Sequence, residues 1–79
     1  MIYQLRRNHA EDLGNGQTRV FGACVFTGEP YECVVPTEGA RLLESGTPAH
    51  VALPKLNLED REFIISGISP TGWEKIFGK

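Results

Sequence analysis

The sequence has 79 residues, of which 41% are hydrophobic, and its formal net charge at pH 7 is -2. A chain of this length is predicted to form a single domain over residues 1–79, and it buries only about 60% of its unfolded surface. The basic residues are scattered and form no stripe with aromatic residues, which weakens a nucleic-acid interpretation. No apolar run approaches the roughly 20 residues of a membrane span. The N-terminus lacks the apolar core of a secretory signal, so a cytoplasmic protein is expected.

The N-terminal half is predicted to be β-structure joined by turns. Residues 2–5 favour an edge strand. Residues 9–18 are rich in polar residues and glycine, so a loop with a turn at Asn15-Gly16 is predicted there. β-branched and aromatic residues then predict a β-hairpin over residues 18–35.

The expected turn of this hairpin sets which residues face each other. A type II′ turn centred on residues 28–29 has glycine at its first central position, as this turn requires. It places Cys24 opposite Cys33 and Phe26 opposite Tyr31. A disulfide between the two cysteines is conceivable, but reduced thiols are expected because cytosolic proteins rarely hold disulfides.

The C-terminal half changes to a helical pattern with clear boundary residues. Side chains that cap helix N-termini, prolines at first helical positions and glycines at helix C-termini alternate along it. The predicted starts are Thr37, Thr47-Pro48, Asn57 and Ser69-Pro70, and the predicted ends are Gly46, Pro54, Gly67 and Gly78.

The last predicted helix carries an apolar face. Trp73, Ile76 and Phe77 stand at positions i, i+3 and i+4, which lie on one side of a helix. We expect Trp73 and Phe77 to lie in the core, because so small a domain needs its large side chains inside. The sequence therefore predicts an α+β fold, with a small antiparallel sheet followed by three or four short helices.

Several segments resemble a family of small, uncharacterised proteins of phages and mobile elements. The matching segments are Gly28 to Tyr31, Ala52 to Leu56, Leu58 to Ile68 and Trp73 to Gly78. Members of this family look like zinc ribbons, with two C-x2-C pairs that resemble zinc ligands. The resemblance implies a degenerate zinc-ribbon-like fold, and it implies no enzymatic activity.

The chain departs from that family at the four positions that resemble zinc ligands. They are Cys24, Thr27, Ser69 and Gly72 in this sequence. Two neutral hydroxyls and a glycine cannot replace three thiolates, and the spacings of Cys33, His9 and His50 match no standard site. We therefore expect no metal and no cofactor. Packing of Trp73 and Phe77 against the hairpin, and of Cys24 and Phe26 across it, is expected to replace the metal.

The candidate catalytic residues have simpler structural explanations. Cys24 or Cys33 with His9 or His50 would make a thiol–imidazole pair, but no glycine-rich oxyanion turn accompanies them. Buried thiols and surface imidazoles are expected instead. The carboxylates at residues 59, 60 and 62 suit the N-terminus of a helix. The sequence therefore favours a protein that is not an enzyme.

The favoured function is non-enzymatic protein binding. Tyr3 lies on an edge strand that could pair with a partner or with a second copy in a homodimer, and Arg6, Arg7 and Arg19 complete the predicted partner-binding set. The resemblance implies an accessory protein or an inhibitor of a host defence complex, comparable to an anti-CRISPR protein. The alternatives are a nucleic-acid-associated module whose arginines, including Arg41, contact phosphates, and a small cysteine-dependent enzyme.

Overall fold

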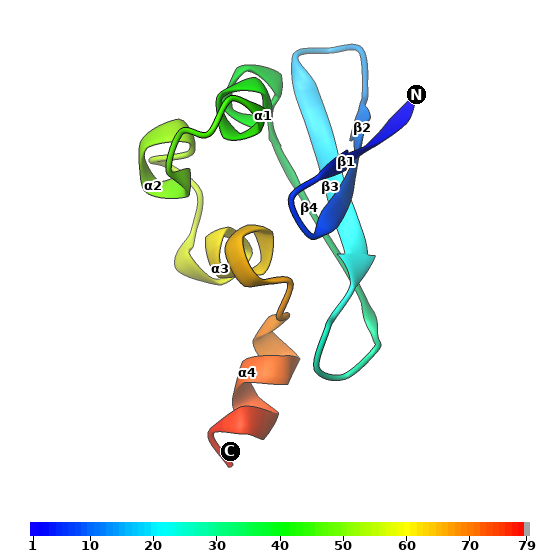
Figure 1. The fold of residues 1–79 in the computed structure, drawn as a ribbon, viewed down its shortest axis with the longest axis vertical. Helices are drawn as coiled ribbons and strands as arrows, with labels where there is room; N and C mark the ends of the chain where they lie inside the picture. The colour runs from blue at the N-terminus through cyan, green and yellow to red at the C-terminus, as the bar shows by residue number, and fades with distance from the viewer. Residues whose placement is uncertain (79) are drawn as a thin grey trace.

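The computed structural model describes residues 1–78 and shows a four-stranded antiparallel sheet followed by four short helices (Figure 1). This arrangement confirms the predicted α+β fold. The strands are β1 (Ile2–Leu5), β2 (Asn8–Asp12), β3 (Gln17–Ala23) and β4 (Pro30–Pro36). The helices are α1 (Thr37–Glu44), α2 (Ala49–Ala52), α3 (Leu58–Ser66) and α4 (Pro70–Ile76). None of the helices in the described part of the chain has the length and apolarity needed to cross a bilayer.

The sheet is a meander in which each strand pairs with the next one in sequence. The predicted loop over residues 9–18 was wrong, because most of this segment forms β2 and the start of β3. The polar residues of this segment are typical of a loop, so the sequence did not indicate the strand. Asn8 and Ala10 are buried whereas His9 is exposed, so β2 has one face in the core and one face in solvent. An antiparallel strand can carry polar side chains on its open face.

The hairpin of β3 and β4 has a different register from the predicted one. Cys33 pairs with Val20, and Tyr31 pairs with Gly22, so the prediction of Cys24 opposite Cys33 was wrong. The connection spans residues 24–29 and is longer than a two-residue turn. It is held by its own hydrogen bonds, in which Gly28 N donates to the Cys24 carbonyl at 2.8 Å. Both cysteines are free and buried.

The core lies between one face of the sheet and helices α1, α2 and α3, which lie beside it (Figure 1). Leu5, Val20 and Val35 are each 1% exposed or less on the sheet side. A buried asparagine fastens the sheet to α3, because Asn8 Nδ2 donates to the carbonyls of Phe63 at 3.3 Å and Ile64 at 3.4 Å. The remaining buried apolar residues of this core are Ala10, Cys33, Ala40, Leu43, Ala49, Ala52, Leu53 and Ile64.

The predicted ends of the helices and the caps of α3 and α4 are confirmed. The predicted caps at Thr37 and Thr47 are wrong, because Pro36 and Pro48 occupy the cap positions of α1 and α2. Asn57 caps α3 by accepting a bond from Asp60 N at 2.8 Å, and Ser69 caps α4 by accepting one from Gly72 N at 3.2 Å. Gly67 ends α3 in the left-handed conformation, with φ 79°. Thr37 is the first residue of α1 and not its cap. Its hydroxyl instead lies 2.9 Å from the Thr18 hydroxyl, which ties α1 to β3.

The prediction that Phe77 lies in the core was wrong. The same prediction for Trp73 is only partly correct, because its side chain is only partly buried. Phe77 is 70% exposed, and Trp73 is half-buried. Phe26 is 55% exposed, so it does not pack across the hairpin either. The reason is the position of α4, which extends away from the sheet at one end of the molecule (Figure 1). Phe63 of α3 takes the core position and packs its ring against Tyr31, with centroids 4.9 Å apart.

Candidate functional site

The side chains of α3 and α4 form an exposed groove of about 590 Å³. Trp73 and Phe77 form one wall, and their rings stack with centroids 5.7 Å apart and planes inclined by 15°. Leu58, which is 63% exposed, lies on the other wall. The full lining is Leu58, Glu59 and Glu62 from α3, Pro70, Trp73 and Glu74 from α4, and Phe77, the residue that caps the C-terminus of α4. The groove is therefore an apolar surface open to solvent.

The spacing of the lining residues explains why they share a groove. On α4 they stand at i, i+3, i+4 and i+7, starting from Pro70, and these positions lie on one helix face. The chain changes direction between the two helices at Gly67, whose positive φ of 79° is disfavoured for other residues. Ser69 then starts α4 immediately as its N-cap. Gly67 and Ser69 thus allow α4 to begin directly after α3 with a sharp change of direction.

The rim of the groove is acidic. Glu59, Glu62 and Glu74 line it, and no lysine or arginine does so among residues 1–78. The ion pairs in this part of the chain all belong to Arg19. The three carboxylates therefore have no cationic side-chain partner within residues 1–78, and they make the groove negative.

A second cluster surrounds Cys24 at the start of α4. Cys24 Sγ accepts hydrogen bonds from Ser69 N at 3.3 Å and from Thr27 N at 3.4 Å. A Cβ placed on Gly72 would lie 2.8 Å from the same sulfur. The four positions that resemble zinc ligands in the sequence therefore lie together in the structure. One thiol, two hydroxyls and a glycine do not fit a zinc ion, which needs four strong ligands.

The two thiols have opposite electrostatic surroundings. Burial raises the pKa of Cys24, but hydrogen bonds from the side chains and backbone of Ser69 and Thr27 outweigh it and bring the pKa to about 6. Burial, followed by the carboxylates of Asp60 and Glu32, raises the pKa of Cys33 to about 12. Cys24 is therefore a thiolate at neutral pH, whereas Cys33 stays protonated.

Neither thiol forms a pair with a histidine in the described part of the chain. His9 lies on the open face of the sheet, where its ring packs against Phe21, and Cys33 lies on the opposite, buried face. His50 is exposed on α2. No cluster of three or more His, Cys, Asp or Glu side chains suited to a metal occurs among residues 1–78.

The four residues predicted to bind a partner do not share one surface. Tyr3 packs against the core on the helix side of the sheet, and burial, followed by the nearby Glu44, raises its pKa. Arg6 and Arg7 are exposed in the turn between β1 and β2. Arg19 lies on the open face of the sheet. Their role in binding stays a prediction.

The Arg19 side chain is already engaged within the sheet. It forms ion pairs at 3.0 Å with Glu11 on β2 and with Glu32 on β4. Its guanidinium also lies 4.0 Å from the centre of the Phe21 ring. Two carboxylates neutralise this arginine, which leaves less charge for contact with a phosphate backbone.

The free edges of the sheet differ in how well they could accept another strand. β1 is one edge and carries the exposed side chain of Ile2. β4 is the other edge, and it begins with Pro30 and ends with Pro36. Proline has no N–H to donate, so both ends of β4 resist pairing. The predicted homodimer through an edge strand therefore stays a prediction that concerns β1.

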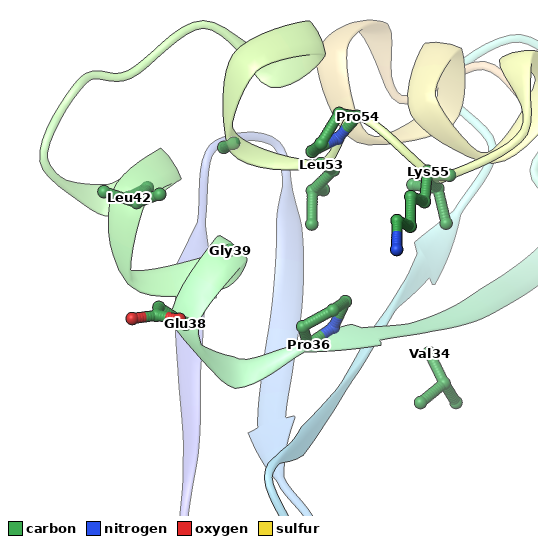
Figure 2. Close-up of a pocket in the computed structure, with 10 residues that line it drawn as sticks. Val34, Pro36, Glu38, Gly39, Leu42, Leu53, Pro54 and Lys55 are labelled. Carbon is green, nitrogen blue, oxygen red and sulfur yellow. The ribbon is translucent and has the colours of Figure 1, made fainter.

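A hollow of about 450 Å³ lies where β4 meets α1 and the segment after α2 (Figure 2). Figure 2 shows Leu53 and Pro36 facing one another across it. Its charged residues are Glu38 and Lys55, one of each sign. Leu53 already fills the space above Gly39, because a Cβ there would lie 2.3 Å from Leu53 Cδ2. The hollow therefore has no net charge to select a ligand, and the Leu53 side chain already fills part of it.

Comparisons of the chain with protein-family models, with curated proteins and with solved structures find no match. Of the groove residues, sequence analysis singled out Trp73 and Phe77 but placed them in the core. It missed Leu58 and Glu74 as parts of a site. Their helical spacing was visible, but their exposure depends on where α4 lies.

Proposed function

We propose that this chain is a non-enzymatic protein-binding module and that the groove between α3 and α4 is its binding face. The observation that carries the proposal is the exposure of Phe77 and Leu58, at 70% and 63%, beside the half-buried ring of Trp73. A contiguous apolar patch with a polar rim is typical of a protein–protein interaction site. Tryptophan is also enriched among the residues that dominate binding energy.

The state of the two thiols supports a non-enzymatic role. Cys24 is only 2% exposed, and its sulfur is occupied by two backbone N–H groups. Cys33 is 7% exposed and is protonated at neutral pH because its pKa is raised. A nucleophilic cysteine needs both a thiolate and access to its substrate, and neither residue combines them.

The resemblance to proteins of phages and mobile elements supports a narrower form of this proposal. In that form the partner is a host protein, such as a subunit of a defence complex. The groove suits this role because two helices present its apolar residues and its acidic rim to solvent.

Affinity capture from a lysate of the host cell tests the proposed function. The parent chain is compared with the double variant Leu58→Ser/Phe77→Ala and with Val51→Ser as a matched control. Val51 is 56% exposed on α2 and lies outside the groove. We expect one stoichiometric partner that the parent and the control retain and the groove variant loses. Equal capture by all three proteins would show that the groove is not the binding face.

We also propose that the Cys24 corner derives from a zinc site, as the resemblance implies. The support is that Cys24, Thr27, Ser69 and Gly72 meet at one corner although they come from two separated segments. The triple variant Thr27→Cys/Ser69→Cys/Gly72→Cys should bind Co²⁺ with the visible absorption of a tetrahedral thiolate site. A side chain at position 72 requires a small displacement of α4, and the free energy of metal binding offsets the cost of that displacement. The parent chain is the control. The same weak absorption in both proteins would remove this proposal.

A further inference from the structure

We infer that the groove receives a short basic amphipathic helix of the partner, an inference that rests on the proposed function. One apolar face of that helix enters between Leu58 and the stacked rings of Trp73 and Phe77. Lysine or arginine residues that flank this face pair with the acidic rim. The recognised chemistry is thus an apolar helical stripe bordered by positive charge.

The construction of the groove favours a helix over an extended strand. Both walls are helices, so the groove offers no row of free backbone N–H and C=O groups with which a strand could pair. A helix satisfies its own backbone groups and brings only side chains to the contact. Its apolar residues at i, i+3 or i+4, and i+7 can lie between the two walls.

The lengths of α3 and α4 set an upper limit on the length of the contact with a bound helix. α3 has 9 residues and α4 has 7 residues. At about 1.5 Å per residue, these helices are about 10–14 Å long. A contact of this length accommodates about two turns of a partner helix, which supply two or three apolar side chains. The expected interface is therefore small.

The charge of the rim selects a basic partner. Glu59, Glu62 and Glu74 have no cationic side-chain partner within residues 1–78. Lysine or arginine beside the apolar stripe gains from all three carboxylates, whereas an acidic helix is repelled. Charge complementarity of this kind sets the choice of partner and the rate of association.

The same charge argues against a second copy of this chain as the occupant. A two-fold symmetric contact places the same surface of both copies face to face. It would bring the three rim carboxylates of one copy against the same three of the other. Like charges at a contact are destabilising, so a partner of opposite charge fits better.

Fluorescence of Trp73 reports binding directly, because it is the single tryptophan of the sequence and lies in the groove. The probes are synthetic helical peptides of about 14 residues, a length near the minimum for a stable isolated helix. One carries a leucine stripe flanked by lysine, and the second has glutamate in place of each lysine. A third has the composition of the first, with two of its lysines moved into the stripe. We expect the first to bind at least about tenfold more tightly than the other two, with the preference over the glutamate peptide shrinking as salt screens the charges.

The variant Glu59→Gln/Glu62→Gln/Glu74→Gln tests the source of that preference. It should lose most of the discrimination between lysine and glutamate peptides, while Val51→Ser keeps it. Equal binding of the lysine and glutamate peptides by the parent chain would overturn the inference that the rim selects a basic partner. If the third peptide bound as tightly as the first, the inference that an apolar helical stripe enters the groove would be overturned. Absence of peptide binding, or a dimer that Phe77→Ala abolishes, would overturn the whole inference. In these cases capture of a partner that depends on Leu58 and Phe77 would still support the proposed function.

Discussion

Substitution of Gly72 by alanine tests how tightly α4 packs on the Cys24 corner. A Cβ at this position would lie 2.8 Å from Cys24 Sγ and 2.8 Å from Ile68 Cγ2, closer than real Cβ contacts. The Cys24 sulfur is held in place, since it accepts hydrogen bonds from Ser69 N and Thr27 N. The added methyl group must therefore displace α4 or the loop that carries Cys24.

Two opposing effects set the size of the change in stability. Overpacking of a well-packed site costs about 1–3 kcal/mol. Alanine in place of glycine within a helix gains up to about 1 kcal/mol. Gly72 lies in the first turn of α4, where that gain is smaller. We therefore expect Gly72→Ala to lower the free energy of unfolding by about 1–2 kcal/mol.

Urea denaturation followed by circular dichroism measures this change, and a double-mutant cycle identifies its cause. In a Cys24→Ala background one of the two close contacts is relieved, so Gly72→Ala should cost about 1 kcal/mol less. Thr71→Ala serves as the control because Thr71 is exposed on the same helix turn. Its effect should stay within about 0.5 kcal/mol.

Two results would contradict a clash between a side chain at position 72 and the Cys24 sulfur. If Gly72→Ala were as stable as the parent chain or more stable, the helix would accept a side chain at this position. If its cost were the same with and without the Cys24 sulfur, the contact with Ile68 alone would be responsible. In either case it would be wrong to infer that position 72 is glycine because the Cys24 sulfur leaves no room for a side chain.

Three further predictions concern the interactions between the sheet and the C-terminal half. In a Cys33→Ser variant, thiolate absorbance near 240 nm should titrate with a midpoint near pH 6, because hydrogen bonds lower the pKa of Cys24. The pKa of Cys24 in the folded protein lies below its usual value of 9.0, so the thiolate stabilises the fold. This contribution to the free energy of unfolding should be fully present above about pH 9 and should be lost as the pH falls through 6. The Cys24→Ser variant serves as the comparison. Asn8→Asp should destabilise the fold by at least about 1–3 kcal/mol in thermal unfolding, more than Asn8→Ala does, because it places a carboxylate against two carbonyls of α3. Tyr31→Phe should cost about 1 kcal/mol in the same assay, since it removes the hydrogen bond that its hydroxyl donates to Asp60, and Asp60→Asn should add little in that background.

Local signals of the sequence determined the helices and most of their ends. Asn57 and Ser69 cap α3 and α4, and Gly67 ends α3 in a left-handed conformation, as their chemistry predicts. These features depend on a few neighbouring residues, so they can be inferred without the rest of the fold. The order of strands before helices followed in the same way and predicted the α+β class.

The sheet was only partly predictable because its polar strand looked like a loop. In β2, Asn8 is buried and bonded to α3, which lies far away in sequence. The register of β3 and β4 also depended on a distant contact. The loop at residues 24–29 is shaped around Cys24, whose sulfur bonds to Ser69 as well as to its own loop. Rules based on sequence patterns and turn types do not take such distant contacts into account.

The candidate site shows the same division most clearly. Trp73 and Phe77 share one face of a helix because of their spacing, which is a local property of the chain. That this face lines a groove and not the core follows from the packing of the whole chain. The corner at Gly67 and Cys24 directs α4 away from the sheet, Phe63 fills the core position, and the exposed rings then lie beside Leu58 and three carboxylates. Exposure depends on what packs against a side chain, and that is a property of the whole fold.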